Sequence, residues 1–333
     1  MIGAGAVGSY YGALLAHAGH DVALVARGAH AAALRRAGAV CVREADGEQW
    51  SVPVRVPPSP RAALRDGADL VLVTVKSHHT AEAGAGLAAA LGDGAARRPD
   101  VLSLQNGVEN PAVLRRLLPP EVPVLAGLAF VGLRVVTPGT VDHQAEGRVV
   151  LGDPAGGRTA AAARVHGLVA GAWDARLAED VAREQWSKLL WNIGFNALCA
   201  VTGATAGEAL ATPETRALVR EAMDEVVALA ASHGVAVPPE RVAAMSAYIP
   251  GLRDYRPSTA QDIAAGKPVE REALTAFMVR AGAARGVPTP VNRVLDALLA
   301  LQEDRATGRI AARLDALAAA VSRPGPPAPG PAR

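Results

Sequence analysis

The sequence predicts an α/β protein with an N-terminal, Rossmann-type doubly wound sheet and an all-helical C-terminal domain. Three observations predict this fold: a glycine motif at the start of the chain, strand-like apolar segments up to about residue 176, and only helical periodicity beyond it. We therefore expect an NADP-binding domain over residues 1–176 and a helical substrate domain over 177–321. Residues 322–333 are rich in Pro, Gly and Ala, which predicts a disordered tail.

The chain opens on a glycine motif in which Gly3, Gly5 and Gly8 fit the pattern G-x-G-x-x-G, followed by an Ala-rich helical pattern. In a dinucleotide-binding unit the first glycine allows a tight turn, the second lets the backbone approach a pyrophosphate, and the third lets helix pack on strand. The N–H groups at the helix start, those of Ala6 and Val7 among them, then face the phosphates. The alternative is a Gly-rich turn in some other α/β protein.

The strands on either side of this motif carry two further predictions. Only Met1 and Ile2 precede the glycines, whereas a strand usually has about 5 residues, so we expect a truncated first strand. The second strand, over residues 21–26, ends at Arg27 without the Asp or Glu that usually holds the ribose of NAD. An arginine fork suits a 2′-phosphate, which favours NADPH over NADH; the alternative is a solvated loop arginine.

Composition excludes several classes of protein. Net charge is +2 over 333 residues, with the arginines scattered, which argues against a nucleic-acid partner. Cys41 and Cys199 have no metal-binding spacing, so we expect no metal site and a reducing compartment. No apolar run approaches the roughly 20 residues of a membrane span, and nothing resembles a signal peptide. These features predict a cytoplasmic protein.

Further strands and helices follow from periodicity. The segment Leu70–Val75 is a continuous apolar run typical of a buried parallel strand, and Val101–Leu104 is the next. Other strand-like segments lie at 40–42, 50–54, 122–131, 133–136, 140–144, 149–151 and 173–176. Predicted helices of the C-terminal part lie at 179–200, from Pro213 to before Gly234, after Pro239, after Ser258, from Pro268 to before Gly286, at 292–302 and at 309–321.

A lysine and two asparagines form the first candidate catalytic group. Only three of the 34 basic residues are lysines, and unlike arginine a lysine can release a proton once its pKa is lowered. Lys188, Asn192 and Asn196 are spaced by four, which keeps them near one face of a strongly apolar helix. A lysine there is a candidate general acid, with the asparagines positioning an oxygen-rich substrate. The alternative is a buried structural ladder of polar groups.

Two residues further along the chain are candidates for substrate contact. Glu270 follows Pro268 in what we expect to be the first turn of a helix, where it could hold a substrate hydroxyl or simply be solvated. Ser258 precedes another predicted helix and has capping-box spacing to Gln261, so an N-cap is its plain role. A helix start also suits a bound carboxylate.

Five segments together resemble the ketopantoate reductase (2-dehydropantoate 2-reductase) family, and the similarity covers about residues 1–321. They are the glycine motif with Arg27, the strand end Val75-Lys76, Leu104–Gly107, Trp186–Asn192 with Asn196, and Pro257–Asp262 followed by Lys267–Glu270. The resemblance implies NADPH-dependent reduction of 2-dehydropantoate to pantoate, with release of NADP+, in pantothenate and coenzyme A synthesis.

The resemblance also implies roles for single residues. Lys188 would protonate the carbonyl oxygen and Glu270 would bind the substrate hydroxyl. Asn192, Asn196 and Ser258 would hold the substrate. The remaining implied contacts are with the cofactor: Asn106 and Glu270 beside its reactive end, Lys76 near it, Arg27 on its 2′-phosphate, and Gly3, Gly5, Ala6, Val7 and Gly8 around its pyrophosphate.

Three residues depart from the family pattern. His79 stands where a glutamine is common, and Arg271-Glu272 stands where Ile-Asp is usual. The alternatives are therefore a related enzyme that reduces another 2-oxo acid or forms an opine-like product, and a non-catalytic NADPH-binding sensor. The expected partner is a small 2-oxo acid rather than a nucleic acid or membrane. A homodimer through the helical domain stays open, since no motif indicates it.

Overall fold

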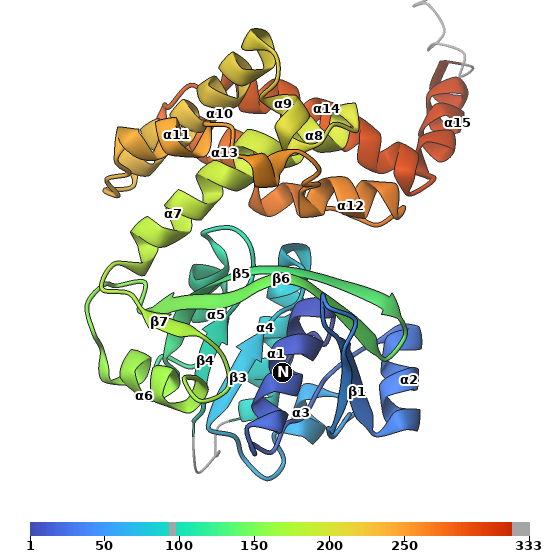
Figure 1. Ribbon diagram of the computed structural model, residues 1–333, viewed down its shortest axis with the longest axis vertical. Coiled ribbons are helices and arrows are strands. Elements are labelled where there is room, and N and C mark those ends of the chain that lie inside the picture. Colours follow the sequence, from blue (N-terminus) through green and yellow to red (C-terminus); the bar gives the residue numbers. More distant parts are fainter. Residues whose placement is uncertain (93–97, 322–333) are drawn as a thin grey trace, which may run out of the picture.

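The computed structural model describes residues 1–92 and 98–321. A sheet with helices on both faces forms the N-terminal part, and helices alone form the C-terminal part above it (Figure 1). The predicted fold class is thus confirmed. The predicted disordered tail, 322–333, lies outside the described residues.

The sheet has seven strands, in the order β2-β1-β6-β5-β4-β3, with β7 on β6. Parallel pairs join β3 to β4, β4 to β5, β1 to β6 and β6 to β7, while β1–β2 and β5–β6 are antiparallel. The strands are β1 (Ala39–Arg43), β2 (Gln49–Pro53), β3 (Leu70–Val73), β4 (Asp100–Ser103), β5 (Val124–Thr137), β6 (Thr140–Gly152) and β7 (Ala175–Leu177).

The first two predicted strands are reduced to single bridges. Ile2 pairs in parallel with Val73 on one side and with Val25 on the other, and Ala23 pairs with Arg55 just after β2. Ile2 therefore lies beside β3, and the segment with Ala23 and Val25 lies between Ile2 and the residues that follow β2. They also place the glycine turn between the ends of two neighbouring strand segments.

Helices cover both faces of the sheet because its central strands are apolar on both sides. Val71 and Val101 pack with α4 and α5, whereas Leu72 and Leu102 pack with α1 and α6 on the opposite face. This alternation follows from the two-residue period of a strand. The helices of this part are α1 (Ala6–His17), α2 (Gly28–Ala37), α3 (Pro60–Ala63), η1 (Ser77–His79), α4 (Thr80–Leu91), α5 (Asn110–Leu117) and α6 (Ala160–Val169).

Strands β5 and β6 form one long hairpin, where the sequence suggested several separate pieces. The hairpin turns at Pro138-Gly139 and runs along the top of the sheet part, next to the helical part (Figure 1). Register shifts next to Phe130, Gly132 and Val135 interrupt the alternation of apolar and polar residues without ending the ladder. Because this alternation is interrupted, the sequence pattern predicted several short strands in place of two long ones.

The helical part has its own core, built around α7 and the turns that follow it. Leu189, Leu190 and Ile193 pack with Met223 of α10 and Phe277 of α13. Among the described residues, no helix is long and apolar enough to cross a membrane. The helices are α7 (Val181–Trp191), the π turn η2 (Asn192–Asn196), α8 (Ala197–Thr202), α9 (Ala206–Ala209), α10 (Pro213–Ser232), α11 (Pro239–Met245), η3 (Pro250–Leu252), α12 (Ser258–Ala264), η4 (Arg271–Ala273), α13 (Thr275–Arg285), α14 (Pro290–Ala306) and α15 (Arg309–Val321).

Two predicted helix starts are wrong. No helix begins at Pro268; the chain stays irregular through Glu270, and α13 begins only at Thr275. Tertiary contacts override the local pattern, because Glu303 accepts a hydrogen bond from the Val269 N–H and the Glu270 side chain is bound by the sheet part. Ser258 is exposed and is the first residue of α12, without a capping bond, because Pro257 takes the extended N-cap conformation.

Candidate active site

The glycine turn combines two crowded positions with one open one. Gly3 has φ +99°, and a Cβ there would lie 2.6 Å from the Val75 nitrogen. A Cβ on Gly8 would lie 2.5 Å from Thr74 Oγ1, whereas a Cβ on Gly5 would meet no atom within 4 Å. Gly3 and Gly8 therefore allow close packing, and Gly5 leaves open space above the turn.

The start of α1 fits the pyrophosphate of a dinucleotide. Gly5 is the N-cap of this helix and offers no side chain to its first turn, which also contains no acidic residue. The first N–H groups of a helix have no partner within it, so those of Ala6 and Val7 are suited to an anion. With the open space above Gly5, this arrangement leaves room for a pyrophosphate, and binding of the cofactor there stays a prediction.

Arg27 lies where the sequence analysis expected it, just after the strand segment that pairs with Ile2. Its guanidinium forms a two-pronged contact with Glu82 of α4, with Nη2–Oε1 and Nη1–Oε2 distances of 2.5 and 3.2 Å. His79 Nδ1 lies 3.2 Å from the same carboxylate. The proposed contact of Arg27 with a 2′-phosphate stays a prediction.

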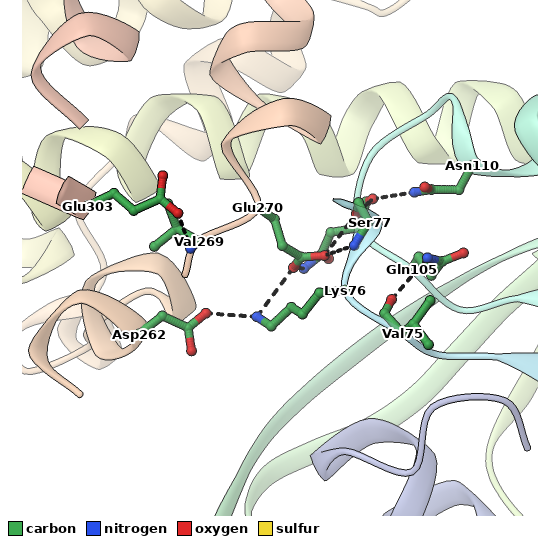
Figure 2. Close-up of polar contacts among 10 residues, drawn as sticks. Val75, Lys76, Ser77, Gln105, Asn110, Asp262, Val269, Glu270 and Glu303 are labelled. Atoms are coloured by element: carbon green, nitrogen blue, oxygen red, sulfur yellow. Dashed lines mark hydrogen bonds and ion pairs between the residues drawn. The ribbon is translucent and has the colours of Figure 1, made fainter. Parts of the chain in front are cut away.

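A charged network joins the end of β3 to the helical part (Figure 2). Lys76 Nζ lies 2.7 Å from Asp262 Oδ2 and 3.5 Å from Glu270 Oε2. Glu270 accepts hydrogen bonds from the backbone N–H and hydroxyl of Ser77 at 3.0 and 2.8 Å, and from Asn106 Nδ2 at 3.0 Å. The network therefore brings together Lys76, Asn106 and Glu270 from three distant parts of the sequence.

Buried Glu270 is charged at neutral pH. Burial opposes its charge, but the Lys76 ammonium and the hydrogen bonds from Asn106 and Ser77 hold the pKa of this carboxyl below its ordinary value. Burial likewise opposes the charge on Lys76, yet Glu270 and Asp262 raise the pKa of that ammonium. The two groups thus form an ion pair between the sheet part and the helical part.

Polar side chains behind the network fix Asn106. Asn110 Nδ2 donates to the Asn106 carbonyl at 2.6 Å, and Thr80 Oγ1 donates to Asn110 Oδ1 at 2.8 Å. Gln105 Nε2 donates to Thr80 Oγ1 at 2.7 Å and to the Val75 carbonyl at 2.9 Å. The ends of β3 and β4 are therefore cross-linked, which holds Asn106 in place.

Lys188 is the second cation of the site, and its environment is different. Its Nζ donates to the Ala129 carbonyl of β5 at 2.6 Å and lies 5.3 Å from the ring centre of Phe130. Burial lowers the pKa of Lys188 to about 8, against the opposing effect of the Glu270 charge. A lysine with this pKa can both hold and release a proton near neutral pH.

A small cavity lies between the end of β4 and α7. It measures about 10 Å³, roughly the room that one water needs. Its lining residues come from both parts of the chain and are Gln105, Asn106, Gly107, Leu128, Gln185, Lys188, Leu189 and Asn192. Lys188, Asn106 and Asn192, which the sequence analysis had grouped as site residues, therefore share one cavity.

Comparison with protein families identifies this arrangement. The family model described as "Ketopantoate reductase PanE/ApbA" matches residues 1–156, and "Ketopantoate reductase PanE/ApbA C terminal" matches residues 180–303. The chain belongs to the ketopantoate reductase family. The first family model matches the sheet part of this chain, and the C-terminal family model matches its helical part.

Relatives from the ketopantoate reductase family match along nearly their whole length. A 2-dehydropantoate 2-reductase of Mesorhizobium japonicum is 31% identical over 327 residues, which cover 90% of this chain and 95% of the relative. The crystal structure of a PanE/ApbA family ketopantoate reductase from Ralstonia eutropha JMP134 is 37% identical with a TM-score of 0.82, covering 92% and 98%. A D-mandelate dehydrogenase, solved with NADH and anilino(oxo)acetate, has the same TM-score at 22% identity over 91% and 97%, which shows the shared fold alone.

The remaining predicted site residues of this ketopantoate reductase family member lie at different depths. Asn192 and Asn196 are buried, and a π turn spans the interval between them in place of the regular helix expected. Such wider turns occur often at functional sites. The Asn196 amide nitrogen has no hydrogen-bond partner among the described residues. Ser258 lies exposed at the start of α12, outside the cavity lining.

Four residues of the candidate site were not predicted as contributors: Ser77, Thr80, Asn110 and Asp262. Ser77 binds Glu270 and Asp262 binds Lys76, and Asp262 stands in a segment that carried the family resemblance. Position directly after the apolar strand was a signal available for Ser77. Asn110 and Thr80 offered no signal, because their role depends on the distance between β3 and β4 side chains.

Proposed function

We propose that this chain reduces 2-dehydropantoate to pantoate with NADPH, as a 2-dehydropantoate 2-reductase of pantothenate and coenzyme A synthesis. The observation that carries the proposal is the partly buried Lys188, with a pKa lowered to about 8, in one cavity with Asn106. We place the reaction in the cytoplasm, where a reducing environment would keep Cys41 and Cys199 as free thiols.

Lys188 is the proton donor in this proposal. Bound NADPH supplies the hydride that adds to the substrate carbonyl carbon. The negative charge that develops on the carbonyl oxygen needs a proton, and the Lys188 ammonium can give it because burial lowers the pKa of this group. The Ala129 carbonyl accepts a hydrogen bond from Nζ and so directs the amine.

Glu270 and the asparagines position the substrate in this proposal. Glu270 Oε2 accepts one hydrogen bond, from Asn106 at 3.0 Å, and Lys76 Nζ lies 3.5 Å away, so this oxygen has a second acceptor position for a substrate hydroxyl. Asn192 faces the same cavity as Lys188. The unpaired amide of Asn196 supports a role in holding an oxygen-rich ligand, because a buried N–H group without a partner is costly.

Another 2-oxo acid is the alternative substrate, and the D-mandelate dehydrogenase with the same fold motivates it. Arg271 and Glu272 had raised this alternative, but neither residue lines the cavity. Arg271 Nη1 binds Asp296 at 2.7 Å, and the Glu272 side chain is 58% exposed. Their position supports 2-dehydropantoate, since the departures lie away from the cavity. A sensor would not need the lowered pKa of Lys188.

The direct test is NADPH oxidation at 340 nm with 2-dehydropantoate, compared with bulky 2-oxo acids such as benzoylformate. We expect the highest kcat/KM with 2-dehydropantoate. A higher value with benzoylformate would move the alternative ahead. NADPH binding without turnover of any 2-oxo acid would favour the sensor.

The variant Lys188→Ala tests the proton donor. We expect kcat to fall by about 10²- to 10⁴-fold, the usual contribution of a general acid, while the Kd of NADPH stays unchanged. Lys267→Ala is the matched control, because Lys267 is an exposed lysine of the same part. Retention of wild-type kcat in Lys188→Ala would remove Lys188 from this role.

A further inference from the structure

The ion pair of Arg27 and Glu82 joins the two strand ends beside the glycine turn. Arg27 follows the segment in which Val25 pairs with Ile2, and α4, with Glu82 in its first turn, follows β3, which pairs with Ile2 on the other side. Both residues therefore lie at the edge of the sheet that carries the glycine turn. In dinucleotide-binding units the ribose of the adenosine is bound at the end of the strand that follows the first helix.

The contact is one that a phosphate would have to replace. Both terminal nitrogens of Arg27 point at the two carboxylate oxygens of Glu82. The two-pronged contact uses both Nη1 and Nη2 of Arg27, so a phosphate that binds the same side of the guanidinium in two-pronged fashion has to displace the Glu82 carboxylate. Lys76 does not substitute for Arg27, because Asp262 and Glu270 hold its ammonium toward the helical part.

We propose that Glu82 and Arg27 together select the cofactor, with Glu82 lowering the preference for a 2′-phosphate so that the chain uses NADH as well as NADPH. This inference rests on the proposed dinucleotide-dependent function and concerns its cofactor. A 2′-phosphate must displace Glu82 from Arg27 and then lies close to a carboxylate charge. A 2′-hydroxyl can instead donate a hydrogen bond to that carboxylate, as it does to the acidic residue of NAD-binding units.

The exposure and the neighbours of Arg27 and Glu82 determine how large the change in cofactor preference is. The side chains of Arg27 and Glu82 are 74% and 55% exposed, so their ion pair is weak and a phosphate can displace it. His79 Nδ1, 3.2 Å from Glu82 Oε2, keeps a second partner on the carboxylate when Arg27 turns away. The Arg27 guanidinium holds the pKa of Glu82 below its ordinary value, so the carboxylate is charged at neutral pH. We therefore expect a shift of about tenfold rather than an absolute preference.

A structural role for Glu82 has a different signature. An acidic residue in the first turn of a helix stabilises that helix through its dipole, and Glu82 occupies such a position in α4. If that were its whole contribution, removing the charge would lower the melting temperature and change the affinity for both cofactors equally. The ratio of the two affinities separates the roles.

The experiment compares the wild type with Glu82→Gln, Arg27→Gln and the control Glu240→Gln. Glu240 is an exposed glutamate in the first turn of α11 in the helical part. The Kd values of NADPH and NADH are measured by calorimetry without substrate, and the kcat/KM values with 2-dehydropantoate. The compared quantity is the preference for NADPH, given by the ratio of the two Kd values and of the two kcat/KM values. We expect this preference to be about tenfold higher in Glu82→Gln than in the wild type. It should be lower by tenfold or more in Arg27→Gln and unchanged in Glu240→Gln.

An unchanged affinity ratio in Glu82→Gln overturns the inference. So does an equal loss of affinity for both cofactors together with a lower melting temperature. If the ratio shifts as expected while no 2-oxo acid is turned over, the cofactor selection stands and the proposed reaction fails.

Discussion

Lys188 and Glu270 show how the surroundings of a buried group decide its charge. Glu270 is buried and Lys188 is partly buried. Four donor groups surround the Glu270 carboxylate, whereas the near partners of Lys188 are a carbonyl and an aromatic ring. The pKa of Glu270 is therefore held low by its partners, and burial lowers the pKa of Lys188. One group stays charged, and the other is ready to give up a proton.

The pH dependence of reduction follows from Lys188. Below about pH 8 the amine is protonated, so kcat/KM should be constant, and above it the value should fall about tenfold per pH unit. The free energy of unfolding has the opposite trend. Between about pH 8 and the ordinary pKa of 10.5, Lys188 holds a proton in the unfolded chain but has lost it in the folded chain. Lys188 therefore increases the stability of the folded chain as pH rises. Rates and melting temperatures measured over pH 6–10 separate the two effects. A rate that stays flat to pH 10 would contradict the assignment.

Glu270→Gln should cost stability because it removes the charge that pairs with Lys76 and replaces one of the two oxygens that accept from Ser77 and Asn106 with an NH₂ donor. We expect the free energy of unfolding at neutral pH to fall by about 1–3 kcal/mol. Because the folded pKa of Glu270 is lowered, its contribution is present above the ordinary value of 4.5 and is lost as pH falls through the folded pKa. Denaturant unfolding at pH 7 and pH 3 measures this. The control is Glu272→Gln, an exposed neighbour that should change stability by less than about 0.5 kcal/mol.

At the scale of elements, the glycine turn, the β5–β6 hairpin and the π turn place the site. The turn fixes the start of α1 against β3, since Thr74 Oγ1 donates to the Gly3 carbonyl at 2.7 Å. The hairpin brings the Ala129 carbonyl to Lys188 of α7. The π turn alters the helix periodicity between Asn192 and Asn196. Each of these three elements therefore places one group of the candidate site, and the spacing of residues in the sequence does not by itself give that placement.

Two glycine variants separate packing from cofactor approach. Gly8→Ala should lower the free energy of unfolding by about 1–3 kcal/mol, because its methyl group would overlap Thr74 Oγ1. Gly5→Ala should leave stability within about 0.5 kcal/mol, since Gly5 has φ −79° and open space around it. It should nevertheless raise the Kd of NADPH at least about tenfold, by occupying the approach of the pyrophosphate. If Gly5→Ala binds NADPH with wild-type affinity, the assignment of the glycine turn to the pyrophosphate of the cofactor is wrong.

At the scale of the whole molecule, polar contacts close the cleft between the two parts. Lys76 with Asp262, Ser77 with Glu270, and Glu109 with Arg280 all connect the sheet part to the helical part. The cavity has room for about one water. A 2-oxo acid is larger than this, so we predict that contacts between the two parts open to admit the proposed substrate.

Gly107 tests the fit of the two parts. It has φ +92°, and a Cβ there would lie 2.8 Å from the Ala273 carbonyl of the helical part. Gly234 has φ +76° with open space around it, so Gly234→Ala carries only the conformational cost of about 1–2 kcal/mol. We expect Gly107→Ala to be less stable than Gly234→Ala by about 1–3 kcal/mol and to lose tenfold or more in kcat/KM through displacement of Asn106. Equal stability and activity of the two variants would show that this close approach is unimportant.

Short-range periodicity and the order of motifs were enough to predict part of this fold. The glycine turn, the apolar strands β3 and β4, the long helix that starts near residue 180 and the change to helices after β7 were all predictable, because each repeats a local pattern of burial. The family resemblance rested on the same motifs. Lys188 and Asn192 could be grouped because the π turn with Asn192 directly continues the helix α7 that carries Lys188.

The contacts between distant segments could not be predicted from local patterns. Glu270 leaves the helical pattern because Ser77 and Asn106, more than 160 residues away, bind its carboxylate. Arg27 meets Glu82 because the strand segments before them flank Ile2. Such positions depend on which strand ends meet at one edge of the sheet. Local propensity contains no information on that arrangement, since it arises from the packing of the whole chain.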